Sequence, residues 1–133
     1  MAKHKTGELT GALLDAAVAK AEGYGPPVLF KTDALGEGES AALWFPHPTL
    51  PSFPVSDWQP SATWAQAGPI IERELIDVSA GCNAGEGDLW DWWAFCPSMR
   101  TGDNGLVAQY GETPLTAAMR AYVASKFGGE VEL

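Results

Sequence analysis

The chain has 133 residues, of which 46% are hydrophobic and 19% charged, a balance typical of one folded domain and unlike that of a disordered chain. Seventeen acidic against eight basic side chains give a net charge of −9, so phosphate backbones would be repelled and a nucleic-acid partner is not expected. No stretch approaches the length of an apolar membrane span and the first residues lack the apolar centre of a signal peptide, so we expect a soluble, unexported protein without membrane contact.

The first periodic segment, Glu8–Gly23, predicts a helix. The residues that recur at helical spacing fall near one helical face, namely Leu9, Ala12, Leu13, Ala16, Ala17 and Lys20. Thr6 and Thr10 are both suitable N-caps, and Gly23 is a natural end.

The segment from residue 25 to residue 60 contains most of the ten prolines, which argues against a helix there. It also carries Trp44, Phe45, Phe53 and Trp58, which a solvated linker would not expose. Prolines reduce the entropy lost when a loop becomes ordered. We therefore interpret the segment as a long, packed loop that could form a rigid pocket wall.

Three strands are expected after this loop, at Pro69–Val78, Leu89–Cys96 and Gly105–Tyr110, because apolar and polar side chains alternate in each. Clusters of Gly, Asn and Asp separate them, which indicates an antiparallel meander. In the second strand Cys96 alternates in phase with Ala94, so we expect a buried thiol.

The last segment predicts a second helix, with Thr113 as N-cap, Pro114 at the first helical position and Gly128 after the last turn. The predicted fold class is therefore α+β: a small antiparallel sheet of three to five strands, an N-terminal and a C-terminal helix, and a long loop rich in proline and aromatic residues.

The stretch SATWAQAGPIIERE, Ser61–Glu74, resembles the centre of the phage NinX family, and both predicted helices also match that family. This family comprises small accessory proteins of lambdoid phages and prophages with no assigned function. Ala62 and Thr63 stand where the family tends to have Thr-Asp, and Ala67 replaces a glycine. The chain length indicates a single domain over residues 1–133, and the resemblance implies a location in the cytoplasm of the infected bacterial host.

The same motif combines side chains that suit a nucleotide-like ligand. Trp64 offers a stacking surface, Gln66 a donor and an acceptor, and Arg73 a planar cation for phosphate. Gly68 would let a ligand approach the backbone. The candidate ligand-binding residues are Trp64, Gln66, Gly68, Pro69, Ile70, Glu72, Arg73, Trp58, Trp44, Thr113 and Arg120.

A structural interpretation of these residues stays open beside the functional one. Trp64 could be a core residue, Gly68 and Pro69 a turn before a strand, and Arg73 the partner of Glu72, Glu74 or a cross-strand acid. Thr113 could simply cap its helix, and Arg120 could be a solvated or ion-paired arginine.

Catalytic machinery is not indicated, because the chain lacks the spacings of metal ligands and a base near a nucleophile. No catalytic residue, metal or cofactor is therefore predicted. We expect a non-catalytic phage accessory protein that binds and sequesters a small nucleotide-derived molecule, such as a bacterial anti-phage defence signal. The alternatives are an acidic inhibitor or adaptor that binds a host or phage protein, and a hydrolase of a nucleotide signal. Six tryptophans are many for a core of this size, so a homo-oligomer is also expected.

Overall fold

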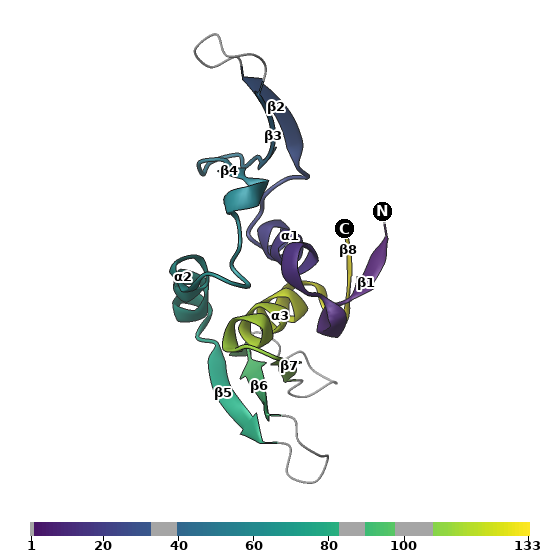
Figure 1. Cartoon of the computed structure of the whole chain (residues 1–133). Coiled ribbons are helices and arrows are strands. Elements are labelled where there is room, and N and C mark those ends of the chain that lie inside the picture. The colour runs from purple at the N-terminus through teal and green to yellow at the C-terminus, as the bar shows by residue number, and fades with distance from the viewer. Residues whose placement is uncertain (1, 33–39, 83–89, 98–107) are drawn as a thin grey trace.

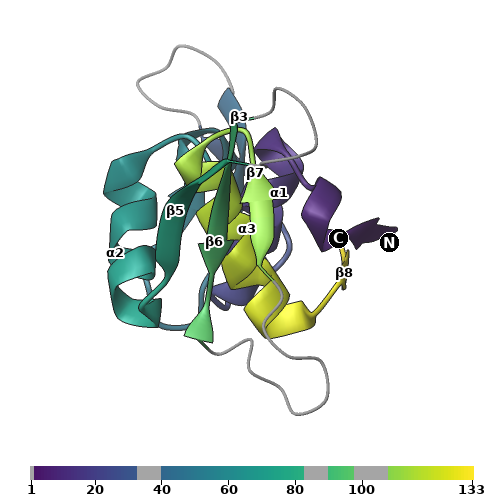
Figure 2. The same ribbon diagram turned by 90° about the horizontal axis from the view of Figure 1, so that it is seen from below.

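The computed structural model describes residues 2–32, 40–82, 90–97 and 108–133. Within these ranges three α-helices combine with three small antiparallel sheets. The helices are α1 (Gly11–Ala21), α2 (Trp64–Glu74) and α3 (Pro114–Phe127). Figures 1 and 2 show α3 in the middle of the molecule, between α1 and the sheet that contains β5 and β6. The predicted α+β class is confirmed, although the strands belong to separate sheets.

The three sheets have two or three strands each. One joins the two ends of the chain and pairs β1 (Lys3–Lys5) with β8 (Glu130–Glu132). The second has the order β2 (Val28–Thr32), β3 (Ser40–Phe45), β4 (Phe53–Pro54). The third has the order β5 (Asp77–Cys82), β6 (Trp90–Phe95), β7 (Gln109–Gly111). Two short 3-10 helices, η1 (Thr6–Glu8) and η2 (Val55–Asp57), complete the described elements.

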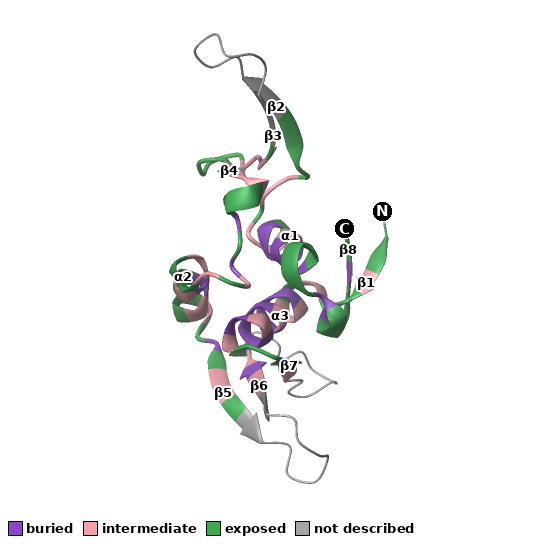
Figure 3. Ribbon diagram, viewed as in Figure 1, coloured by how far each residue is buried: buried purple, intermediate pink, exposed green. Residues whose placement is uncertain are grey.

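The core is built around α3, whose predicted N-terminus is confirmed. The Thr113 hydroxyl accepts a hydrogen bond from the Thr116 N–H at 3.1 Å, and Pro114 begins the helix. Figure 3 shows buried residues concentrated on α1 and α3. The fully buried side chains of α3 include Ala117, Ala118, Met119, Ala121, Tyr122 and Val123. Cys96 is buried against this core, as the strand alternation predicted.

The helix α1 is confirmed, but only part of the face that the sequence pattern defines is buried. Leu14 and Val18 are buried, whereas Ala12 and Leu13 are exposed. Five of the eleven residues of α1 are alanine. Because alanine is small and tolerated on either side of a helix, the pattern distinguishes the faces of this helix poorly.

The strand predicted at Pro69–Val78 is wrong over most of its length. Helix α2 continues to Glu74, Leu75 ends it in the left-handed conformation at φ 54°, and β5 begins only at Asp77. Ala67 and Ile70 are buried and form the face of a helix. A proline at the sixth helical position costs a backbone hydrogen bond, so the packing of that apolar face outweighs the local preference against a helix.

The proline-rich segment is also more regular than expected. Strands β2 and β3 form an antiparallel hairpin within it, and β4 pairs with the end of β3. Pro26, Pro27 and Pro46 flank the hairpin, and Pro54 lies in the outer strand β4, where a missing N–H is tolerated. The other prolines of the segment lie in the connections between elements. Figure 1 shows β2 and β3 projecting away from α1 and α3.

Gly111 allows the close approach of β7 to the start of α3, which gives a direct test of the packing. A Cβ atom on Gly111 would lie 2.6 Å from the Ala117 nitrogen and 3.0 Å from the Thr116 carbonyl carbon. Both neighbours are helix backbone and cannot move independently. We expect Gly111→Ala to lower the free energy of unfolding by about 1–3 kcal/mol in urea denaturation.

Gly68→Ala is the matched control, because a Cβ atom there meets nothing within 4 Å. It should leave the stability unchanged or raise it by about 0.5–1 kcal/mol, since alanine favours a helix interior. Equal stability of the two variants would contradict this account of the β7–α3 contact.

Candidate functional site

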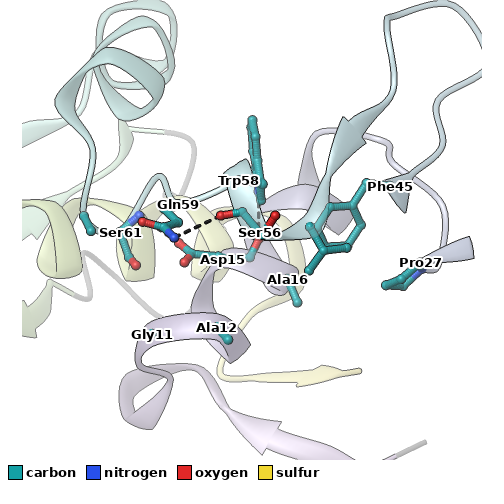
Figure 4. Close-up of a pocket in the computed structure, with 12 residues that line it drawn as sticks. Gly11, Ala12, Asp15, Ala16, Pro27, Phe45, Ser56, Trp58, Gln59 and Ser61 are labelled. Atoms are coloured by element: carbon teal, nitrogen blue, oxygen red, sulfur yellow. Dashed lines mark hydrogen bonds between the residues drawn. The ribbon is translucent and has the colours of Figure 1, made fainter. Parts of the chain in front are cut away.

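A pocket of ≈ 450 Å³ lies between α1 and the segment that leads from β4 to α2. This volume falls within the range of small-molecule sites, and the wall is mainly apolar. Figure 4 shows the lining residues, which come from α1, from the position just before β2, from the end of β3 and from residues 55–62. They are Gly11, Ala12, Asp15, Ala16, Pro27, Phe45, Val55, Ser56, Trp58, Gln59, Ser61 and Ala62.

Asp15 of α1 attaches the outer wall of the pocket to the core. Its backbone carbonyl accepts a hydrogen bond from the Trp58 indole Nε1 at 2.9 Å, and its carboxylate Oδ1 accepts one from the Ser61 N–H at 2.8 Å. The Trp58 ring is only 7% exposed and lies 5.6 Å, between ring centroids, from Tyr24. The residues between Trp58 and Ser61 are therefore fixed at both ends to one helical residue.

The Asp15 carboxyl group is itself nearly buried, with 7% of the residue exposed. Burial raises the pKa of Asp15 above its ordinary value, and the backbone and side-chain hydrogen bonds from Ser61 partly oppose that rise. The pocket thus contains an acidic group that is held in place and poorly hydrated.

Gln66, one of the candidate ligand-binding residues, holds the pocket wall in place. Its Oε1 accepts a hydrogen bond from the Gln59 N–H at 2.6 Å, and its Nε2 donates one to the Asp57 carbonyl at 2.6 Å. The amide therefore bridges the backbone on either side of Trp58. The central motif holds the wall against α2, just as Asp15 holds it against α1.

Trp64 and Arg73, the pair expected to converge on a ligand, lie at opposite ends of α2. Nine helical positions separate them, which corresponds to about 13 Å along the axis. Trp64 is 58% exposed, so its interpretation as a core residue is wrong. Neither residue lines the pocket between α1 and residues 55–62.

The Arg73 guanidinium takes part in a network that connects all three helices. Its NH2 lies 3.0 Å from Glu22 Oε2 and 3.2 Å from the Tyr122 hydroxyl, and its Nε lies 3.1 Å from Glu74 Oε2. Burial and the nearby Glu22 carboxylate raise the pKa of Tyr122, which therefore keeps its proton and can donate to Glu22. The pairing of Arg73 with Glu74, one of the structural interpretations, is confirmed.

The family model described as "Bacteriophage P22, NinX" matches residues 5–126, from the end of β1 through almost all of α3. This chain belongs to the phage P22 NinX family. No curated protein matches the chain. In the described part of this NinX-family chain, none of the helices combines the length and the apolar character that crossing a membrane requires.

The remaining candidate residues of this NinX-family chain lie outside the pocket. Thr113 caps α3, and Arg120 donates to the carbonyls of Leu9 at 2.8 Å and Tyr110 at 2.6 Å, which ties α3 to η1 and β7. The others are placed as follows: Ile70 buried, Gly68 and Trp44 half-buried, Pro69 and Glu72 exposed. Of the eleven candidates, Trp58 is the one among the described lining residues.

Sequence reasoning missed Asp15, which lines the pocket and anchors its wall. The signal was present, since an acidic side chain interrupts the otherwise apolar run from Ala12 to Ala19. A charge on the buried side of an amphipathic helix needs a hydrogen-bonding partner, and Ser61 supplies it here.

The burial of Asp15 predicts a pH-dependent effect of Asp15→Asn, which keeps an oxygen for the Ser61 N–H and removes the charge. The folded-state pKa is raised above the ordinary value of 3.8, so the folded protein retains a proton that the unfolded chain releases. The stability that Asp15 contributes to the wild type is thus lost as the pH rises from its unfolded-state pKa through its raised folded-state pKa. We expect the stability of the variant relative to wild type to be greater at pH 7 than at pH 3.5.

Urea denaturation followed by tryptophan fluorescence at both pH values measures this difference. Asp57→Asn, at an exposed position of η2, controls for the change in net charge. A stability difference for Asp15→Asn that is the same at both pH values, or greater at pH 3.5, would contradict the assignment of a buried, raised-pKa carboxyl group.

Proposed function

We propose that this protein is a non-catalytic phage accessory protein that binds and sequesters a small nucleotide-derived molecule, such as a signal of a bacterial anti-phage defence system. It would do so in the cytoplasm of the infected host, where such a signal is made. The observation that carries the proposal is the ≈ 450 Å³ pocket, which combines an aromatic wall with a few fixed polar groups.

The pocket wall has the chemistry that a nucleobase or nucleoside requires. Trp58 and Phe45 supply aromatic surface for the planar base. Gln59 donates its Nε2 to the Ser56 carbonyl at 3.0 Å, which leaves its Oε1 as an acceptor at an exposed rim. The aromatic side chains can therefore contact the apolar part of a small ligand, and the Gln59 Oε1 can accept a hydrogen bond from its polar part.

The composition of the wall favours binding over turnover. Its nucleophile candidates are the hydroxyls of Ser56 and Ser61, and no histidine, cysteine or lysine stands among the described lining residues. A serine hydroxyl needs a neighbouring base to become a good nucleophile. Asp15 lies at the pocket but already accepts from Ser61, which supports an anchoring role.

Isothermal titration against a panel of cyclic nucleotides and cyclic ADP-ribose isomers tests the proposal. We expect at least one member to bind with a Kd in the micromolar range or below. Ala12→Phe should weaken that binding at least tenfold, because Ala12 is an exposed residue of the pocket wall whose enlargement fills the cavity.

Ala65→Phe is the matched control, since Ala65 is also exposed and is also the second residue of an eleven-residue helix, but does not line the pocket. It should bind within twofold of wild type. A flat panel with folded protein would count against the proposal, and release of product from a bound ligand would favour a hydrolase.

We also propose that the protein self-associates through the β2–β3 hairpin. Leu29 and Leu43 lie directly opposite each other in the register, and they are 53% and 48% exposed. β2 is an outer strand, so no described strand pairs with its outer edge. A second copy presents the same edge and the same leucines, which suits a two-fold antiparallel contact.

Light scattering after gel filtration tests this arrangement. We expect wild type to have about twice the chain mass of 14.1 kDa and Leu29→Lys combined with Leu43→Lys to be a monomer, because charges would be buried in the contact. Leu50→Lys, at a position that is similarly exposed and outside the hairpin, should remain dimeric. A monomeric wild type, or a dimer that survives the double substitution, would rule out this contact.

A further inference from the structure

We propose that the pocket selects a guanine-type base, read by the Asp15 carboxylate through two adjacent N–H donors, with the phosphates outside the pocket. The inference rests on the proposed function, because it specifies which part of a nucleotide-derived ligand enters the pocket and why. It is carried by the position and the unused hydrogen-bonding capacity of Asp15.

Asp15 has acceptor capacity left after the pocket wall is anchored. An ionised carboxylate can accept about four hydrogen bonds. Within the described part of the chain its only hydrogen-bond partner is Ser61, through the backbone N–H at 2.8 Å and the side chain. Asp15 is 7% exposed and lines the pocket, so a ligand with N–H donors can use the lone pairs that Ser61 leaves.

The second feature is the charge of the lining. Asp15 is the single ionisable side chain among the described lining residues, and none of them is lysine or arginine. A phosphate beside this carboxylate would be repelled without a compensating cation. The ligand group beside Asp15 should therefore be a hydrogen-bond donor and not an anion.

The neighbouring cavity shows where the rest of the ligand can go. A second pocket of ≈ 360 Å³ shares Ala16, Pro27 and Phe45 with the first, so the two adjoin. Lys20 and Glu132 both line it, and the Lys20 Nζ donates to the Glu132 carbonyl at 2.8 Å. One cation and one anion give no strong attraction for phosphate, so the base and not the phosphate should determine the specificity.

Guanine fits these constraints better than the other purines. Its imino N–H and its exocyclic amino group lie side by side, so both can donate to one carboxylate while the ring contacts Trp58 and Phe45. Hypoxanthine keeps the imino N–H but lacks the amino group. Adenine has one amino group beside an acceptor nitrogen, which would face the carboxylate unfavourably.

Titration of wild type with GMP, IMP, AMP and guanosine tests the inference. We expect GMP to bind at least tenfold more tightly than IMP or AMP, because a good bidentate pair discriminates by about ten- to a hundredfold. Guanosine should bind within a few-fold of GMP. Among the cyclic nucleotides, those with guanine should bind and those with adenine alone should not.

Asp15→Asn provides the second readout. Its amide can still accept from Ser61 but presents a donor or a single acceptor to the base, so we expect it to lose at least tenfold in affinity for GMP and little for IMP. The comparison of GMP with IMP on wild type stands even if the variant does not fold.

The possible failures are distinguishable. If folded wild type binds no nucleoside or nucleotide, the proposed function and the inference both fail. If it binds nucleotides but prefers adenine, requires the phosphate, or loses nothing on Asp15→Asn, the inference is overturned and the proposed function stands.

Discussion

The hydrogen bonds between Asp15 and the wall segment are the constraint on which the candidate site depends. A helical backbone carbonyl is normally used inside its own helix, yet that of Asp15 also accepts from the Trp58 indole. The carboxylate of the same residue accepts from Ser61. Burying the acid costs free energy, as its raised pKa indicates, and the bonds to the wall recover part of that cost. These hydrogen bonds hold the segment from Trp58 to Ser61 at a fixed distance from α1, and the pocket lies between the two.

The wall is held from a second side by the centre of the family motif. Gln66 uses both ends of its amide on the backbone around Trp58, and Ile70 fixes α2 to the core. At the far end of α2, Arg73 then pairs with Glu22 at the end of α1 and donates to the Tyr122 hydroxyl of α3. The motif thus has a positioning role: it places a short helix so that the preceding loop forms one face of a pocket.

The elements that the sequence predicted correctly are those with strong local signals. Thr113, Pro114 and Gly128 mark the ends of α3 independently of the rest of the fold. The alternation that ends in Ala94 and Cys96 indicates the buried face of the strand β6. Pro69 misled the prediction for α2, because its local cost is offset by packing between residues distant in sequence. The site residues were harder to predict, since Asp15 and Ser61 are 46 positions apart and no spacing rule connects them.

The same reasoning explains why the two most suggestive side chains of the motif do not form the pocket. A tryptophan, an amide and an arginine within ten residues suggest one binding surface, but a helix spreads them along about 13 Å of axis and turns Trp64 away from the face that Gln66 and Arg73 share. In a strand, side chains two apart would have shared a face. The interpretation of the motif therefore depended on its secondary structure, and the helix turned Gln66 toward the wall and Arg73 toward the carboxylates of Glu22 and Glu74. What is left to contact a ligand is the surface that this framework presents: an aromatic wall, a few polar groups and a single acid. Under the proposed function, that set favours the recognition of a base by its hydrogen-bonding edge over the recognition of phosphate by charge.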